Sequence, residues 1–208
     1  MRAGEGGDVA ELIYDSTNAW YVGHGRPAMF SGPKGDVRLF CSVYEALDPG
    51  CCVVAEDCAA QRLAGSCFYH PRSTHVSLGI MNVHPDYFGQ GVASRMLRYV
   101  TDVADRDGKP VRLVSSAMNL DSYSLYNRVG FVPRLTYQDM IMSVPAGGLN
   151  WEAPGSDRVR PATPADLAAM TELDWEVNHI RREKDMRYFV ENAEGIWHVS
   201  VLEGNAGT

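Results

Sequence analysis

A pair of glycines between a strand-like segment and a helical pattern constrains this chain more than any other feature. The segment reads Val83-His84-Pro85-Asp86-Tyr87-Phe88-Gly89-Gln90-Gly91-Val92-Ala93-Ser94. The first turn of a helix carries unpaired N–H groups and the positive end of the helix dipole, and both attract anions. Gly89 and Gly91 have no Cβ, so a pyrophosphate can approach the backbone closely there. The pattern therefore predicts a binding site for a phosphorylated ligand.

Charge and composition exclude several classes of protein. The formal net charge is −7, the charges are spread along the chain, and no basic block or Arg-rich helix is present. Nucleic acid is therefore not an expected partner. No stretch reaches the ~20 apolar residues of a membrane span, and the N-terminal residues lack the apolar core of a signal peptide. We expect a soluble, cytoplasmic protein with no membrane partner.

The cysteines support the same compartment. There are five, at positions 41, 51, 52, 58 and 67, an odd number without a CxxC pair. This usage predicts reduced, buried thiols rather than a disulfide framework.

Hydrophobic periodicity predicts a mixed α/β fold. Helices are expected from an N-cap at Asp8, over 36–47, over 91–106, and over 121–129 with Gly130 as the C-cap. Strands are expected over 51–55, 63–70, 75–83 and 111–116, with one or two more over 131–144. The connections between the first three strands are short, which favours an antiparallel meander.

A Gly- and Pro-rich stretch divides the chain. We expect a first domain over residues 1–145, a linker over 146–157 and a second, partial unit over 158–208. The second unit is expected to contain a strand over 159–162, a helix that opens at Pro164 and a strand over 197–202.

Two motifs in a fixed order carry a family resemblance. The first, Phe88 to Ala93, matches a (Gln/Arg)-x-x-Gly-x-(Gly/Ala) loop except at Phe88. In the second, Asn119 stands seven residues before Tyr126, and Gly130-Phe131 follows. The pair, each with a strand before it, resembles the GNAT superfamily of acyl-CoA-dependent N-acyltransferases over residues 8–144.

The resemblance implies a central, mostly antiparallel mixed sheet that is splayed at the cofactor site and flanked by helices. The strand that precedes the first helix in the family is missing here. Residues 158–208 resemble the opening of a second such domain, so the chain is similar to a fragment of a tandem-GNAT protein. We hypothesise that the strand around Val159 pairs with the first domain's open sheet edge, within one chain or between two in a homodimer.

The resemblance also implies acetyl-CoA as the acyl donor. Its pantetheine arm would bond to main chain near Met81 and Val83. Asn119 would contact the cofactor, although it is equally suited to capping the following helix. Phe88 removes one polar contact, so weaker or altered binding is expected. The pyrophosphate would rest on the main-chain amides of Gly89, Gln90, Gly91, Val92, Ala93 and Ser94.

The catalytic residue that the resemblance implies is Tyr126, which would protonate the leaving thiolate. A phenol with a pKa near ~10 is protonated at neutral pH; the alternative is an aromatic ring that packs under the short helix. The general base stays open, because no carboxylate lies between His75 and Val83. The nearby polar candidates are His75, Ser77, Asn82 and His84. His70 and His75 lack a third ligand, so no metal site is expected.

The sequence thus predicts an N-acetyltransferase that transfers an acetyl group by direct attack of a primary amine. The acceptor, a small molecule or a peptide, would enter between the N-terminal helices and the sheet, past the loop over residues 21–27. The alternative is a noncatalytic acyl-CoA-binding or regulatory module. A dinucleotide-binding oxidoreductase is disfavoured, because its glycine fingerprint belongs at the first turn of a parallel sheet.

Overall fold

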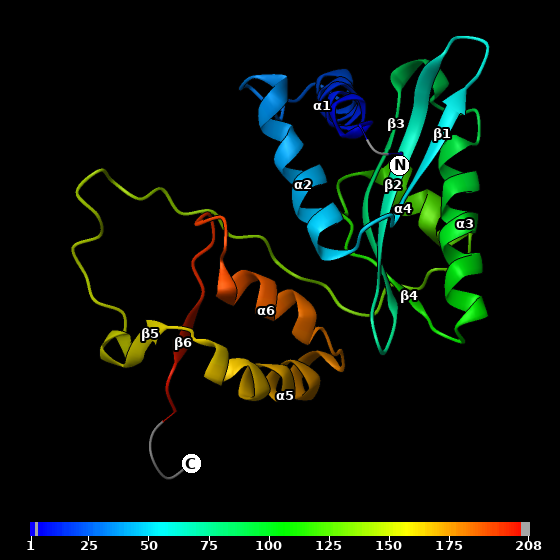
Figure 1. Ribbon diagram of the computed structural model, residues 1–208. Helices are drawn as coiled ribbons and strands as arrows, with labels where there is room; N and C mark the ends of the chain where they lie inside the picture. Colours follow the sequence, from blue (N-terminus) through cyan, green and yellow to red (C-terminus); the bar gives the residue numbers. More distant parts are fainter. Residues whose placement is uncertain (3, 205–208) are drawn as a thin grey trace. The chain divides into compact units, whose positions relative to one another are not determined.

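The computed structural model describes residues 1–2 and 4–204. The chain forms two compact units, Met1–Leu125 and Tyr126–Thr208 (Figure 1). The division falls inside a helix, earlier than residue 145, where the sequence places the end of the first domain. The domain limits stay a prediction.

The first unit is a four-stranded mixed sheet with helices on both faces (Figure 1). The strand order is β1-β2-β3-β4, with antiparallel pairs except for the parallel pair β3/β4. The predicted α/β fold and the antiparallel meander are confirmed. The elements are α1 (Gly6–Gly23), η1 (Lys34–Val37), α2 (Arg38–Leu47), β1 (Cys52–Asp57), β2 (Arg62–Pro71), β3 (Val76–Val83), η2 (Pro85–Tyr87), α3 (Val92–Arg106), β4 (Val111–Arg112) and α4 (Leu120–Arg128).

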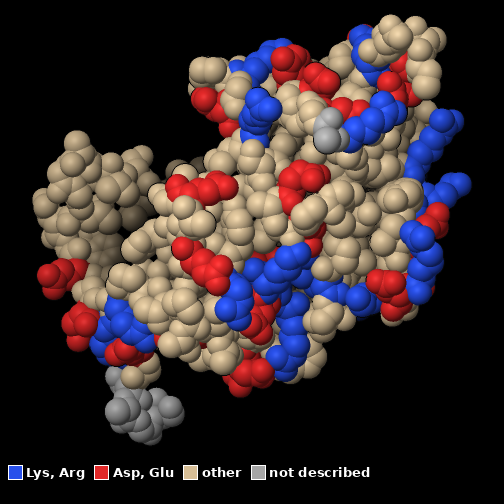
Figure 2. Space-filling model, in the orientation of Figure 1, with Lys and Arg blue, Asp and Glu red and all other residues tan. Residues whose placement is uncertain are grey.

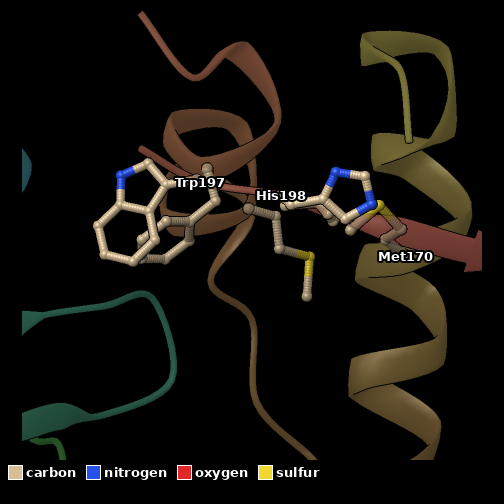
Figure 3. A pocket seen from close by; sticks show the side chains of 6 residues that line it. Met170, Trp197 and His198 are labelled. Atoms are coloured by element: carbon tan, nitrogen blue, oxygen red, sulfur yellow. The ribbon is translucent and has the colours of Figure 1, made fainter. Parts of the chain in front are cut away.

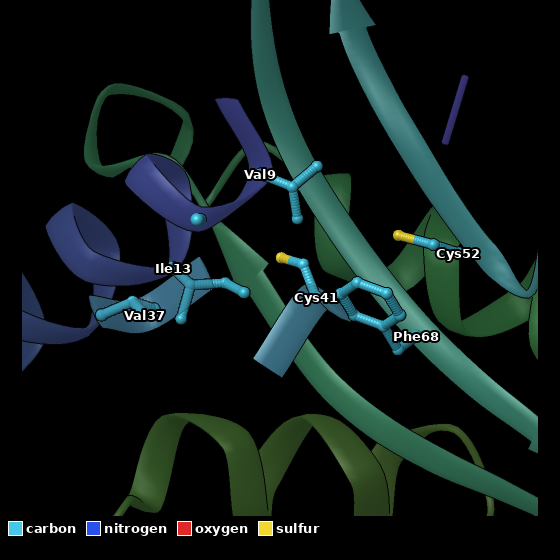
Figure 4. Close-up of a cluster of buried hydrophobic side chains, with 7 residues drawn as sticks. Val9, Ile13, Val37, Cys41, Cys52 and Phe68 are labelled. Atoms are coloured by element: carbon cyan, nitrogen blue, oxygen red, sulfur yellow. The ribbon is translucent and has the colours of Figure 1, made fainter. Parts of the chain in front are cut away.

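A buried cluster joins α1 and α2 to one face of the sheet (Figure 4). Burial of these apolar side chains supplies the main driving force for docking the two helices. The cluster consists of Val9, Ala10, Ile13, Val37, Cys41, Cys52 and Phe68. On the opposite face, α3 lies close enough to β2 that a Cβ on Gly65 would meet Met96 at 2.8 Å.

The described cysteines are free thiols. Cys41, Cys52 and Cys67 are buried as predicted, whereas Cys51 is half-buried and Cys58 is exposed. Burial raises the pKa of Cys41 to about 11 and the pKa values of Cys52 and Cys67 to about 12. These three thiols are therefore protonated and act as apolar core groups.

The first helix begins earlier than expected. Asp8 was expected as the N-cap, but α1 starts at Gly6 and Glu5 takes the cap position. Asp8 lies in the first turn instead, where its carboxylate interacts favourably with the helix dipole. The second predicted helix begins as the 3-10 turn η1 before it continues as α2.

Two strand predictions are wrong, one in its length and the other in the existence of the strands. The strand expected over 111–116 is only β4, Val111–Arg112, because its ladder with β3 ends at the pair Ser77/Arg112. The strands expected over 131–144 do not form. β-Propensity reflects packing against neighbouring strands, and in this segment the apolar side chains are exposed instead. They are Val132, Leu135, Tyr137, Met140, Ile141, Met142 and Val144.

The second unit contains a two-stranded antiparallel sheet and two helices. Its elements are η3 (Ser156–Arg158), β5 (Val159–Pro161), η4 (Pro164–Asp166), α5 (Leu167–Asn178), α6 (Glu183–Glu191) and β6 (Ser200–Leu202). The expected first strand and helix are present, and α6 is an addition. β5 pairs with β6; its pairing with a strand of the first domain or of a second copy stays a prediction.

An apolar cavity of about 320 Å³ lies within the second unit. Figure 3 shows Trp197 at one end and Met170 with His198 at the other. The lining residues are Met170, Met186, Phe189, Trp197, His198 and Val199. With His198 as its one titratable side chain, the lining offers no acid–base pair for group transfer.

Candidate functional site

The sheet opens on one side of β3. The β3/β4 ladder contains two pairs, Val76/Val111 and Ser77/Arg112, and beyond them β3 has no strand partner on that side among the described residues. On its other side, β3 stays paired to β2 as far as Val83. The main chain at Met81 and Val83 therefore borders the open side, which suits an extended ligand that bonds like a strand.

A register irregularity precedes the open segment. The pairing between β2 and β3 shifts between Cys67 and Tyr69, so that Phe68 faces both Gly79 and Ile80. Such a bulge bends a strand and increases its local twist. A Cβ on Gly79 would lie 3.0 Å from the Cβ of Phe68, so any larger residue there would have to displace its neighbours.

The predicted glycine turn leads directly into α3. Gly89 has a φ of +75° and Gly91 a φ of +80°, conformations that glycine adopts without strain. A Cβ on either residue would meet no atom within 4 Å. The first helical hydrogen bond runs from Arg95 N to Gly91 O, so the N–H groups of Val92, Ala93 and Ser94 precede the intrahelical ladder. This open cradle of N–H groups fits a diphosphate.

Gln90 is tied into the turn itself. Its main-chain N–H donates to Tyr87 O at 3.2 Å, and its side-chain Nε2 donates to Asp86 O at 2.7 Å. These bonds pre-organise the turn, so Gln90 supports its shape. Its predicted contact with the cofactor stays a prediction.

A polar network that the sequence did not predict braces the turn against the β1/β2 hairpin. Arg62 donates to Asp86 Oδ2 at 2.7 Å and to the Tyr87 hydroxyl at 3.1 Å. That hydroxyl donates to Asp57 Oδ2 at 2.6 Å, which lowers the pKa of the carboxyl. No local pattern could reveal these contacts, because the partners lie on separate elements. Phe88, by contrast, is exposed and offers no polar group.

Asn119 caps the fourth helix. Its Oδ1 accepts a hydrogen bond from Ser122 N at 3.0 Å at the start of α4, which is the capping alternative that the sequence left open. A contact between Asn119 and the cofactor stays a prediction.

Tyr126 lies on α4. It is the first residue of the second compact unit, since the first unit ends at Leu125. Its ring meets Phe131 edge-on at 5.8 Å between centroids, and its carbonyl accepts from Phe131 N at 3.0 Å. Tyr126 therefore has the aromatic packing role that the sequence offered as the alternative. The role as a proton donor stays a prediction.

The four candidates for the general base lie at the two ends of β3, two at its start and two at its end. His75 is buried beside Thr74 at the β2/β3 hairpin, and Ser77 faces His70 in the paired part of the strand. Asn82 and His84 lie at the end near the glycine turn. His84 Nδ1 accepts from Asp86 N at 3.2 Å and thereby caps η2.

Asn82 fastens α1 to the open part of β3. Its Nδ2 donates to Ser16 Oγ at 2.7 Å and to Thr17 Oγ1 at 3.2 Å. The Ser16 hydroxyl in turn donates to Leu12 O at 2.6 Å. An amide is not basic, so the structure gives Asn82 a positioning role for the helix.

The end of α1 is tied to the start of α4. Trp20 Nε1 donates to Asp121 Oδ2 at 3.0 Å, and His24 stacks on Trp20 with 4.2 Å between the ring centroids. The loop expected over 21–27 at the acceptor entrance is shorter than predicted, because α1 continues to Gly23 and the loop begins at His24. The sequence does not predict this contact between Trp20 and Asp121.

His70 belongs to a buried polar cluster with Asp48 and Arg72. Its Nδ1 lies 2.7 Å from Asp48 Oδ2, and Asp48 also pairs with Arg72. Over residues 1–2 and 4–204, no three or more His, Cys, Asp or Glu side chains gather in a way that could hold a metal ion. In the same described ranges, no helix is both long and apolar enough to cross a bilayer.

The surface charge is mixed. Figure 2 shows acidic and basic side chains interspersed on the face in view. A ligand with several phosphates would therefore depend on directed N–H groups, such as those that open α3, rather than on a broad basic surface.

Comparison with known proteins agrees with this architecture. The model of the Acetyltransferase (GNAT) family matches residues 13–131. No curated protein matches the sequence. Among solved structures, one described as an acetyltransferase from Pyrococcus horikoshii is similar at 18% identity and a TM-score of 0.68, over 96% of this chain and 62% of that chain. The present chain thus spans less than two thirds of that relative.

Other similar structures are more distant. The ribosomal-protein-S18-alanine N-acetyltransferase from Escherichia coli has 15% identity and a TM-score of 0.48, over 71% of this chain and 83% of that chain. The ribosomal-protein-alanine N-acetyltransferase from Brucella melitensis biovar Abortus has 15% identity and a TM-score of 0.46, over 68% and 96%.

The four-stranded mixed sheet with helices on both faces has the fold of the structure described as an acetyltransferase from Pyrococcus horikoshii. The chain belongs to the GNAT acetyltransferase family, whose model covers more than half of it. Both the family and the fold that the sequence motifs implied are confirmed.

Proposed function

We propose that this protein is an N-acetyltransferase that transfers an acetyl group from acetyl-CoA to a primary amine by direct attack. One observation carries the proposal: the open glycine turn at the start of α3 follows directly on the stretch of β3 that β4 leaves unpaired. A diphosphate and an extended, amide-bearing arm are the ligand parts that suit these two features.

The donor would be held mainly by main chain. Met81 and Val83 would bond the pantetheine amides along the open edge of β3. The N–H groups of residues 89–94 would take the diphosphate, with Gln90 closing the turn behind them. Acetyl-CoA supplies the thioester, and the protein supplies its alignment with the amine.

The transfer forms a C–N bond and breaks the C–S bond. The amine must attack as the neutral base, so its ammonium form first gives a proton to solvent or to a base that the structure leaves open. As the C–S bond breaks, the leaving thiolate takes a proton, for which the Tyr126 hydroxyl is the proposed donor. The nitrogen gives up one proton as the amide forms, and that proton restores the hydroxyl through solvent.

We expect Tyr126→Phe to lower kcat by on the order of 100-fold, because general acid catalysis typically contributes at least this much. The affinity for acetyl-CoA should not change. Release of free CoA under saturating amine measures kcat, and titration calorimetry measures the affinity. Tyr123→Phe, on the same helix, is the matched control. A Tyr126→Phe protein with the kcat of the wild type would show that this residue is not the acid.

A noncatalytic acyl-CoA-binding module is the second candidate function. Phe88 at the polar position of the loop favours it, as does the lack of a carboxylate on β3. Calorimetry with acetyl-CoA, followed by a broad amine panel, separates the two functions. Binding without release of free CoA from any amine would favour the binding module.

The free thiols support a reducing compartment, and we infer a cytoplasmic location from them. A homodimer through an open sheet edge remains our proposal for the assembly. Light scattering at several concentrations tests it, and a monomer throughout would contradict it.

A further inference from the structure

We propose that Asp121 determines acceptor specificity by binding a second, cationic group of the amine substrate. The preferred acceptor would then be a diamine-like molecule that carries an ammonium group besides the nitrogen that reacts. This inference rests on the proposed N-acetyltransferase function and names the substrate class for the same site.

The Asp121 carboxylate is oriented by a residue far away in the sequence. Trp20 Nε1, at the end of α1, donates to Oδ2 at 3.0 Å, and His24 Nε2 lies 3.6 Å from the same oxygen. Both neighbours act on Oδ2, which leaves Oδ1 to other donors. A solvated aspartate in a first helical turn would not require this cross-element contact.

The charge of this carboxylate is available to a ligand. The Asp121 side chain is 73% exposed. Within the part of the chain that the structure describes, no Lys or Arg forms an ion pair with it. An exposed carboxylate with a fixed orientation and no Lys or Arg partner is suited to an ammonium group.

Trp20, which donates to this carboxylate, also contacts two further rings. His24 stacks on Trp20 at 4.2 Å, and Tyr21 meets Trp20 edge-on at 5.2 Å. Aromatic faces attract cations electrostatically, so they add to the preference for an ammonium group over a neutral one.

The location links this cluster to the proposed site. α1 extends to Gly23, so the loop expected at the acceptor entrance begins at His24, which lies beside Asp121, and Asp121 stands two residues after Asn119, the proposed cofactor contact. The nitrogen that attacks the thioester must be uncharged, so the ammonium held by Asp121 is a different nitrogen of the same acceptor. Direct attack on acetyl-CoA is otherwise unchanged.

A pair of matched acceptors tests this inference. We would measure kcat/KM with acetyl-CoA for 1,5-diaminopentane and for 1-aminopentane, which differ only in the terminal ammonium group. We expect the wild type to prefer the diamine by about 10- to 100-fold, the range of a hydrogen bond to a charged group. In Asp121→Asn, which keeps the shape and removes the charge, the ratio should fall to near one.

Asp102→Asn, an exposed aspartate on α3, is the matched control and should keep the wild-type ratio. The preference of the wild type should also weaken as the salt concentration rises. Calorimetry with acetyl-CoA verifies that each variant is folded and binds the donor.

The outcomes separate this inference from the proposed function. A wild type without diamine preference, or an Asp121→Asn variant that keeps it, overturns the role of Asp121 while turnover of either amine upholds acetyl transfer. If acetyl-CoA binds and neither amine reacts, the role of Asp121 is also overturned. The broader amine panel then decides between enzyme and binding module.

Discussion

Replacing Gly91 by glutamate is expected to weaken acetyl-CoA binding by on the order of 100-fold or more. The new side chain would enter the open space of the cradle and set a carboxylate against the diphosphate, and like charges in contact cost several kcal/mol, with tenfold in affinity for each ~1.4 kcal/mol. The φ of +80° adds backbone strain for any residue with a Cβ. Titration calorimetry with acetyl-CoA measures the effect.

Gly108→Glu is the control for strain and charge. Gly108 also has a positive φ, +62°, with open space around it, and it lies just beyond the opposite end of α3. This variant should bind acetyl-CoA as the wild type does. Equal affinities of Gly91→Glu and the wild type would mean that the diphosphate binds elsewhere.

Replacing Asp48 by alanine is expected to destabilise the protein by about 3–5 kcal/mol, the usual effect of removing one partner from a buried ion pair. Asp48, His70 and Arg72 are each less than 10% exposed. Arg72 Nη1 donates to Asp48 Oδ1 at 3.0 Å and Arg72 Nη2 lies 2.9 Å from Oδ2, so the variant would leave a buried guanidinium without this carboxylate. Urea denaturation measures the free energy of unfolding.

Asp15→Ala is the matched control. It removes an ion pair about as short as that of Asp48, but one that is exposed to solvent. Asp15 lies 2.7 Å from Lys34, and both side chains are more than 40% exposed. Exposed pairs contribute ~0–1 kcal/mol, so this variant should stay near wild-type stability. A similar loss in both variants would contradict the idea that burial makes the Asp48 contact important.

Local signals in the sequence were sufficient to predict much of the fold and the glycine turn. The apolar runs of β1, β2 and β3 are separated by short turns, which specify an antiparallel meander without reference to distant residues. Gly89 and Gly91 follow a strand and open an amphipathic helix, so their role depends on neighbours in the sequence alone. Gly130, at a φ of +98°, follows α4 as predicted.

The errors concern features that depend on distant partners. Val114, predicted in a strand, is exposed because the ladder of β4 ends at Arg112. Ile141 belongs to a segment of strand-like composition, and its side chain is almost fully exposed. Composition predicts how well a residue fits a sheet, whereas the ladder partner decides whether the strand forms.

The polar contacts that complete the site were equally invisible in the sequence. Trp20 and Asp121 are 101 residues apart, and Arg62 reaches Asp86 from another element. Each of these residue types is common on protein surfaces, so nothing in the local pattern marks the pairing. Only the folded chain brings such side chains together.

The most direct measurement is a crystal structure of this protein with acetyl-CoA. We expect the diphosphate within hydrogen-bond distance of main-chain N–H groups in residues 89–94, with the pantetheine arm beside Met81 and Val83. A diphosphate bound at any other place, or none at saturating acetyl-CoA, would contradict this expectation.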